Sequence, residues 1–129
     1  FDTTLMAARM IYAGIFERYP DFPLVLAHTG AALIVLMERL DNGYRLFPDC
    51  RKYIDKLPSE YGKRLYYDTC AFGEKALMFA IDSVGTGQIL FGTDDPFIGT
   101  DTAHVTRLPV SDADKAAILG GNAARLFGL

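Results

Sequence analysis

Two side chains in this sequence could bind a metal ion or move a proton, and they occupy similar positions: His28 and Asp94. Each follows a short apolar run, and a glycine or proline stands two residues after it. This pattern is typical of a parallel strand that is buried on both faces and carries chemistry at its C-terminal end. Imidazole and carboxylate groups suit the same borderline metals, zinc above all. Two such groups are too few to hold a metal firmly, so we expect them to form part of a larger site.

From spacing alone, His28 and Asp94 also have structural interpretations. An aspartate before a proline often caps a turn, and a histidine at a strand end is often satisfied by backbone groups. Three further residues have simpler roles: we expect Asp95 to be a solvated loop carboxylate, His104 a surface residue in a polar loop, and Cys70 a small buried thiol. For Asp68, structural hydrogen bonding is expected, with bracing of the site as the functional alternative.

The composition predicts one domain over residues 1–129, half of it hydrophobic and large enough to bury about two-thirds of its unfolded surface. A net charge of −3 with scattered basic residues argues against nucleic acid and membrane partners. We expect neither a membrane span nor a basic-then-apolar leader. Two cysteines without CxxC spacing indicate a reduced, cytoplasmic setting. Because the chain starts at Phe1 directly before a helix signal, we expect it to be cut from something longer.

Apolar spacing predicts helices alternating with short strands. The expected helices run through residues 5–15, 33–44 and 77–84 and onward from Ser111; the expected strands are 24–27, 65–69 and 89–92. The polar stretch 47–62 is interpreted as an excursion with short helices. Ser111 and Asp114 resemble a capping box. We expect Gly120 and Gly121 to break the last helix and Asn122 to cap a final turn.

This alternation predicts a parallel sheet with right-handed crossovers. Three strands cannot close a barrel, and alone they make a poor open sheet with unprotected edges. The helices are suited to covering one face, as in the outer ring of a (β/α)8 barrel, of which three strands and four helices are a little under half. A flavodoxin-like sheet is the alternative, but its glycine-rich phosphate loop is missing after the first strand, where residues 29–32 are a weak substitute.

Six short segments together resemble the C-terminal portion of the amidohydrolase-related family, the group that contains aminocarboxymuconate semialdehyde decarboxylase and the resorcylate-type decarboxylases. They span nearly the whole chain, in the family's order: residues 15–21, 26–28, 38–41, 66–69, 91–97 without 95, and 121–127. The resemblance implies an α/β fold that is the C-terminal part, about three strands and four helices, of a (β/α)8 TIM barrel.

The resemblance also implies one divalent metal at the C-terminal face, with zinc expected and manganese as the alternative. Asp94 would bind this metal or activate its water, and His28 would act on that water or on the substrate, so both are candidate catalytic residues. The family's remaining ligands, on its first and fifth strands, are histidines or a glutamate that this chain lacks. Ala31 and Ala32 replace family glycines, and Asp95 replaces an aromatic residue, so the pocket wall differs.

The implied function is non-oxidative decarboxylation, or hydrolysis, of a small carboxylic acid. This chain alone would be inactive unless another polypeptide supplied the missing ligands, and we expect a homo-oligomer or association with the N-terminal half. The alternative is a catalytically inactive half-barrel or self-associating module, driven to pair by its exposed strand edges. A dinucleotide- or flavin-binding module ranks third because the glycine-rich loop is absent.

Overall fold

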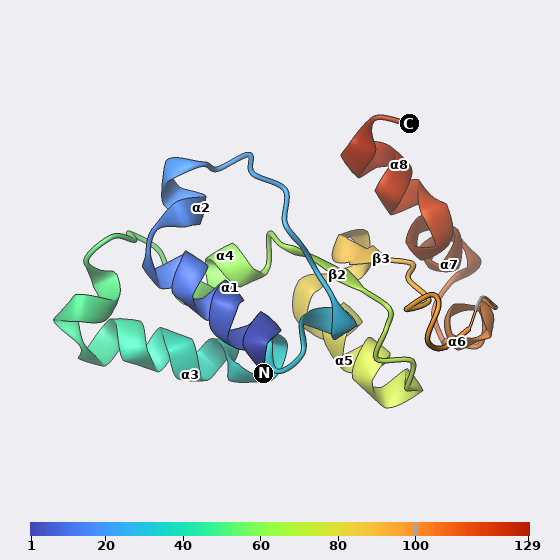
Figure 1. Ribbon diagram of the computed structural model, residues 1–129, viewed down its shortest axis with the longest axis horizontal. Coiled ribbons are helices and arrows are strands. Elements are labelled where there is room, and N and C mark those ends of the chain that lie inside the picture. The colour runs from blue at the N-terminus through green and yellow to red at the C-terminus, as the bar shows by residue number, and fades with distance from the viewer. Residues whose placement is uncertain (100) are drawn as a thin grey trace.

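The computed structural model describes residues 1–99 and 101–129 and shows an α/β architecture. Its first half contains α1 (Asp2–Tyr12), α2 (Ile15–Arg18), β1 (Val25–Leu26), the 3-10 turn η1 (His28–Gly30), α3 (Leu33–Leu46), η2 (Pro48–Arg51) and α4 (Pro58–Gly62). The second half contains β2 (Tyr66–Asp68), α5 (Glu74–Val84), η3 (Thr86–Gln88), β3 (Ile89–Leu90), α6 (Ala103–Thr106), α7 (Asp112–Ala116), the π-turn η4 (Ala117–Gly121) and α8 (Asn122–Phe127). The strands lie in the middle, with α1 to α4 on one side and α6 to α8 on the other (Figure 1).

The described strands form one parallel sheet in the order β1-β2-β3, which confirms the predicted parallel pairing. Leu26 pairs with Tyr67, which in turn pairs with Ile89. Because all three strands run the same way, their C-terminal ends meet at one edge of the sheet. The residues that follow each strand therefore come together there.

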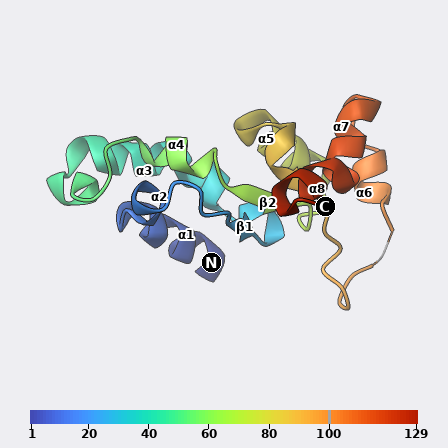
Figure 2. The ribbon, with the colours of Figure 1, turned by 90° about the horizontal axis from the view of Figure 1, so that it is seen from above.

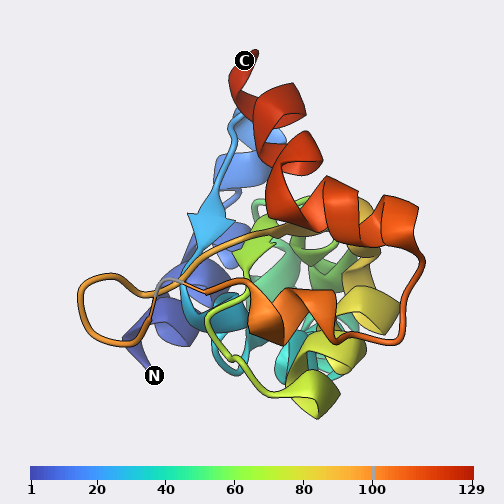
Figure 3. The same ribbon diagram turned by 90° about the vertical axis from the view of Figure 1, so that its right-hand side faces the viewer.

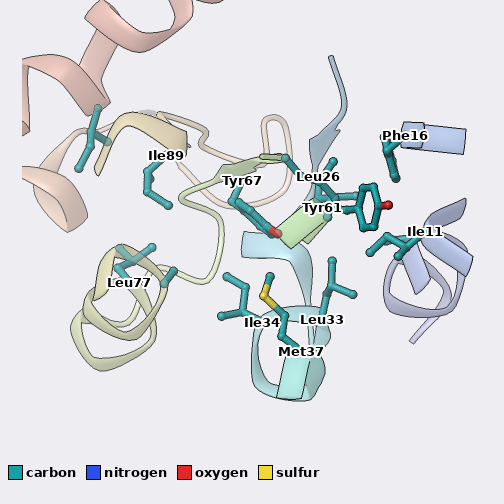
Figure 4. Packing of buried hydrophobic residues seen from close by; sticks show 14 of the residues in the cluster. Ile11, Phe16, Leu26, Leu33, Ile34, Met37, Tyr61, Tyr67, Leu77 and Ile89 are labelled. Carbon is teal, nitrogen blue, oxygen red and sulfur yellow. The ribbon is translucent and has the colours of Figure 1, made fainter. Parts of the chain in front are cut away.

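The core lies between this sheet and the helices. Leu26, Tyr67 and Ile89, one from each strand, are fully buried and pack with Leu33 of α3 and Leu77 of α5 (Figure 4). The same strands are not buried on both faces as predicted. Val25 of β1 is 39% exposed, because three strands leave one face of the sheet without a covering layer.

The expected first helix is two helices. Gly14, between α1 and α2, has φ +71°, and a Cβ atom there would collide with the backbone oxygen of Tyr53. Glycine alone takes this left-handed conformation without a steric cost, so the chain turns at this point, well before Pro20.

The C-terminal region also differs from the prediction. The expected pairing of Ser111 with Asp114 is present as a helix N-cap: the Ser111 hydroxyl accepts a hydrogen bond from the Asp114 N–H at 3.1 Å and donates to the Asp114 carboxylate at 2.6 Å. Gly120 and Gly121, however, do not end the helix, because the π-turn η4 carries it into α8. Asn122 caps nothing and is buried within the helix. No helix of the described ranges is long and apolar enough to cross a membrane.

Candidate active site

The structure brings His28 and Asp94 together, as predicted from their positions after strands. His28 opens the turn η1 directly after β1, and Asp94 lies in the loop after β3. The Nε2 atom of His28 is 3.9 Å from Oδ1 of Asp94, and the two side chains are 59% and 32% exposed. Residues 91–99, which follow β3, project past β1 (Figure 3) and stand away from the helices (Figure 2).

The backbone that carries these two residues is strained. His28, Thr29 and Ala31 have φ values of 56°, 54° and 53°, and Asp94 has 56°. Each non-glycine residue in the left-handed region costs on the order of 1–3 kcal/mol and persists only where its surroundings hold it. Such strain often accompanies a functional site, so the groups that stabilise this backbone bear directly on the site.

Asp68 is one of these groups. Its Oδ2 accepts a hydrogen bond from the His28 N–H at 3.0 Å, and its Oδ1 accepts from the Thr29 N–H at 2.7 Å and the Cys70 N–H at 3.0 Å. The Thr29 hydroxyl in turn accepts from the Ala71 N–H at 3.1 Å. The expected hydrogen-bonding role of Asp68 is confirmed, and it acts on the backbone of the η1 turn.

A second cluster joins the end of β2 to the segment after β3. Thr69 is fully buried. Its hydroxyl accepts from the Gly92 N–H and donates to the Gly92 carbonyl, both at 3.0 Å, and it lies 2.8 Å from Nε2 of His104. His104 is therefore not the surface residue that the sequence predicts: it is half-buried in α6, next to the rings of Phe72 and Phe91.

Asp95 lies at the surface as predicted, whereas Cys70 is more exposed than the buried thiol that the sequence predicts. Cys70 is half-buried, and burial raises the pKa of its thiol to about 11, with the neighbouring Asp68 carboxylate acting in the same direction. Its sulfur lies so close to Gly92 that a Cβ atom at that glycine would approach it to 2.9 Å. Asp95 is exposed.

A pocket of about 330 Å³ adjoins His28 and opens between η1, α3 and α5. Its wall is largely apolar, with Ala31, Val35 and Phe79 among the lining residues, and Lys75 supplies a positive charge at its edge. Ala31, one of the two alanines that replace family glycines, thus lines a space beside the candidate histidine.

The donors at this edge are suited to a divalent metal but do not complete a site. Imidazole and carboxylate bind manganese and zinc alike, and His28 and Asp94 are close together. Within residues 1–99 and 101–129, however, no group of three or more His, Cys, Asp or Glu side chains is placed to hold a metal ion. A bound metal would need further ligands from outside this set.

Comparison with known proteins shows to which family the chain belongs. The amidohydrolase family model matches residues 2–129. The chain therefore belongs to the amidohydrolase family, which confirms the resemblance seen in the sequence.

The relatives include several decarboxylases. The chain is 29% identical to 2-amino-3-carboxymuconate-6-semialdehyde decarboxylase of Dictyostelium discoideum and 32% identical to gamma-resorcylate decarboxylase of Polaromonas sp.. Each match covers 99% of this chain but 37% and 41% of the relative. The chain thus spans about two-fifths of the length of the curated relatives that it matches.

Two solved decarboxylase structures resemble this chain in fold. The 5-carboxyvanillate decarboxylase of Sphingomonas paucimobilis matches with a TM-score of 0.85 and 32% identity, over 95% of this chain and 38% of that one. A dihydroxybenzoic acid decarboxylase of Polaromonas sp., with bound manganese and the inhibitor 2-nitroresorcinol, matches with a TM-score of 0.86 and 32% identity, over 98% and 40%. The fold is therefore the C-terminal part of a (β/α)8 barrel.

Proposed function

We propose that this chain provides the C-terminal part of a metal-dependent decarboxylase acting on small carboxylic acids, with Asp94 as a metal ligand and His28 as the residue that moves a proton. The observation that carries this proposal is the 3.9 Å approach of His28 Nε2 to Asp94 Oδ1 at the C-terminal ends of the strands, where barrel enzymes build their sites. Membership of the amidohydrolase family and the named decarboxylase relatives support it.

Asp94 would hold a divalent metal together with ligands from outside these residues. Manganese is the better-supported ion because a related structure contains it, although zinc fits the same donors. When bound, the cation supplies positive charge that neutralises an acidic substrate. The hydrogen bonds that fix the Gly92 backbone hold the loop that presents Asp94.

His28 would supply the proton that decarboxylation requires. In that reaction the bond between the carboxylate and its carbon breaks, carbon dioxide leaves, and the electron pair left on the carbon takes up a proton. The exposed Nε2 of His28 is a basic nitrogen that can hold and release that proton. The apolar pocket beside it offers a surface for an aromatic ring.

The remaining ligands would come from strands that pair with this sheet. Within the described residues, β1 and β3 each pair on one side only. Their free edges carry unpaired backbone groups that favour pairing with further strands. These edges support completion of a barrel by further strands that carry the remaining ligands.

Hydration is a second candidate, because a 2-keto-4-carboxy-3-hexenedioate hydratase of Sphingobium sp. is 24% identical over 96% of this chain. Incubating the complete, manganese-loaded barrel with dihydroxybenzoates separates the two reactions, since only decarboxylation releases carbon dioxide. We also expect Asp94→Asn to lose manganese while keeping its helical content, and His28→Ala to keep manganese but lose turnover.

Asp95, the exposed neighbour of Asp94, provides a matched control. Asp95→Asn removes a carboxylate next to Asp94 and is expected to leave both metal binding and turnover unchanged. Retained manganese in Asp94→Asn would overturn its assignment as a ligand. Normal turnover in His28→Ala would return that residue to a structural role.

A further inference from the structure

We propose that the end of β2 sets the relative positions of His28 and Asp94, with Asp68 and Thr69 as positioning residues. This inference rests on the proposed function of the two residues that they hold. Asp68 and Thr69 are consecutive, and each binds the segment that follows a different neighbouring strand. The middle strand thus fixes both sides of the candidate site.

Asp68 holds the His28 side. The left-handed backbone of η1 turns the N–H groups of His28 and Thr29 toward the Asp68 carboxylate. An ionised carboxylate only accepts hydrogen bonds, and it has room for all three N–H donors that surround Asp68. Such charge-assisted bonds are about twice as strong as neutral ones, so they can hold a strained turn in place.

Asparagine at position 68 cannot reproduce this arrangement. Two of the donors share Oδ1 and the His28 N–H alone bonds Oδ2. With the amide oxygen at the Oδ1 position, two of the three bonds survive and the amide nitrogen faces His28. The substitution therefore releases the His28 backbone selectively.

Thr69 holds the Asp94 side. The ladder between β2 and β3 ends at the pair formed by Asp68 and Leu90. Beyond it, the buried Thr69 hydroxyl bonds both the N–H and the carbonyl of Gly92, two residues before Asp94. Beyond the last paired residues, the Thr69 side chain thus makes the hydrogen bonds to the Gly92 backbone that a neighbouring strand would otherwise make.

Loss of the Asp68 contact and loss of the Thr69 contact are expected to affect different steps of the reaction. A displaced His28 affects proton transfer, whereas a displaced Asp94 affects metal binding. Misplacement of a reacting group by about 1 Å can cost about 100-fold in rate, and loss of a group that orients a metal ligand costs about 10–100-fold in metal affinity. Asp68→Asn is therefore expected to lower kcat with manganese affinity unchanged, and Thr69→Val to weaken manganese binding.

The experiment uses the complete manganese-loaded enzyme and measures kcat, KM, manganese affinity and thermal stability. We expect Asp68→Asn to lower kcat about 10–100-fold, and Thr69→Val to weaken manganese binding about 10-fold or more, with recovery in Thr69→Ser. Asp41→Asn is the matched control, because Asp41 is a buried carboxylate that accepts from the N–H and hydroxyl of Ser59 away from the site. It is expected to reduce stability but not kcat.

A double-mutant comparison separates positioning from simple destabilisation. In the His28→Ala background, Asp68→Asn is expected to lower the residual kcat by no more than about two-fold. If Asp68→Asn does not fold, Asp68→Glu, which displaces the carboxylate, takes its place. An equal loss with and without His28, or a Thr69→Val enzyme with normal manganese affinity, overturns the positioning proposal. Unchanged turnover and manganese binding in His28→Ala and Asp94→Asn themselves would instead overturn the proposed function.

Discussion

The Nε2 atom of His104 lies 2.8 Å from the hydroxyl oxygen of Thr69. A hydroxyl has one hydrogen to donate, and the Thr69 hydroxyl directs it to the Gly92 carbonyl while it accepts from the Gly92 N–H. All three contacts are hydrogen bonds only if His104 donates, and we therefore infer that its Nε2 carries a hydrogen. The ring of Phe91 stacks on the imidazole at 5.5 Å, and that of Phe72 meets it edge-on at 5.0 Å.

This arrangement predicts the tautomer of His104 and its contribution to stability. Nitrogen NMR is expected to find the neutral ring protonated at Nε2. His104→Phe keeps an aromatic ring beside Phe91 but removes the donor, and it should lower the free energy of unfolding by about 1–2 kcal/mol in urea denaturation. His104→Gln, whose amide can still donate, should lose less. A neutral ring protonated only at Nδ1 would contradict the donor assignment.

The strands and their parallel pairing could be predicted because each strand is a local apolar run with turn residues after it. The same reasoning brought His28 and Asp94 together, since parallel strands end at one edge. The role of His104 could not be predicted in this way. It depends on Thr69, 35 residues earlier in the sequence, and a histidine in a polar segment carries no local sign of such a partner.

Whether a glycine ends a helix could not be predicted from the sequence either, because the outcome depends on tertiary contacts. Gly14 breaks a helix that its neighbours favour, and the approach of Tyr53 allows no side chain there. Gly120 and Gly121, in contrast, continue a helix, because Asn122 and Ile118 pack inward and hold it against β3. In both places glycine stands within a segment of helical apolar spacing, and only the tertiary surroundings differ.

Asn122 is predicted to be a stability determinant. Its Nδ2 donates to the carbonyls of Thr86 and Ile89 at 2.8 Å each, and the side chain is fully buried. Asn122→Ala leaves these acceptors without partners and should lower the free energy of unfolding by about 1–3 kcal/mol. Asn42→Ala, which removes an exposed asparagine bonded to Arg45, is the control and should change stability by no more than about 0.5 kcal/mol. Equal losses of stability for Asn122→Ala and Asn42→Ala in urea denaturation would refute the prediction.

Cys70 is predicted to react slowly with alkylating reagents. The thiolate is the reactive form, and burial together with the Asp68 carboxylate raises the pKa of this thiol to about 11. At pH 8 only about 0.1% is then ionised, and the rate should rise until the pH passes about 11. In a Cys50→Ser variant, mass spectrometry of iodoacetamide labelling reports on Cys70 alone. Asp68→Asn should accelerate labelling at pH 8, and a rate equal to that of free cysteine in the parent would contradict the prediction.

The 129-residue chain by itself is predicted not to bind manganese firmly. His28 and Asp94 are close, but the described part of the chain holds no group of three candidate ligands. A ligand at free concentration L that binds only the folded state stabilises it by RT ln(1 + L/Kd), so the melting temperature rises only when the ligand concentration approaches or exceeds Kd. At about 1 mM manganese the isolated chain should therefore show no increase in Tm, and Asp94→Asn should behave identically. The complete barrel should show an increase that Asp94→Asn abolishes. A manganese-dependent rise in the isolated chain, lost in Asp94→Asn, would mean that these residues form a sufficient metal site without the remaining strands.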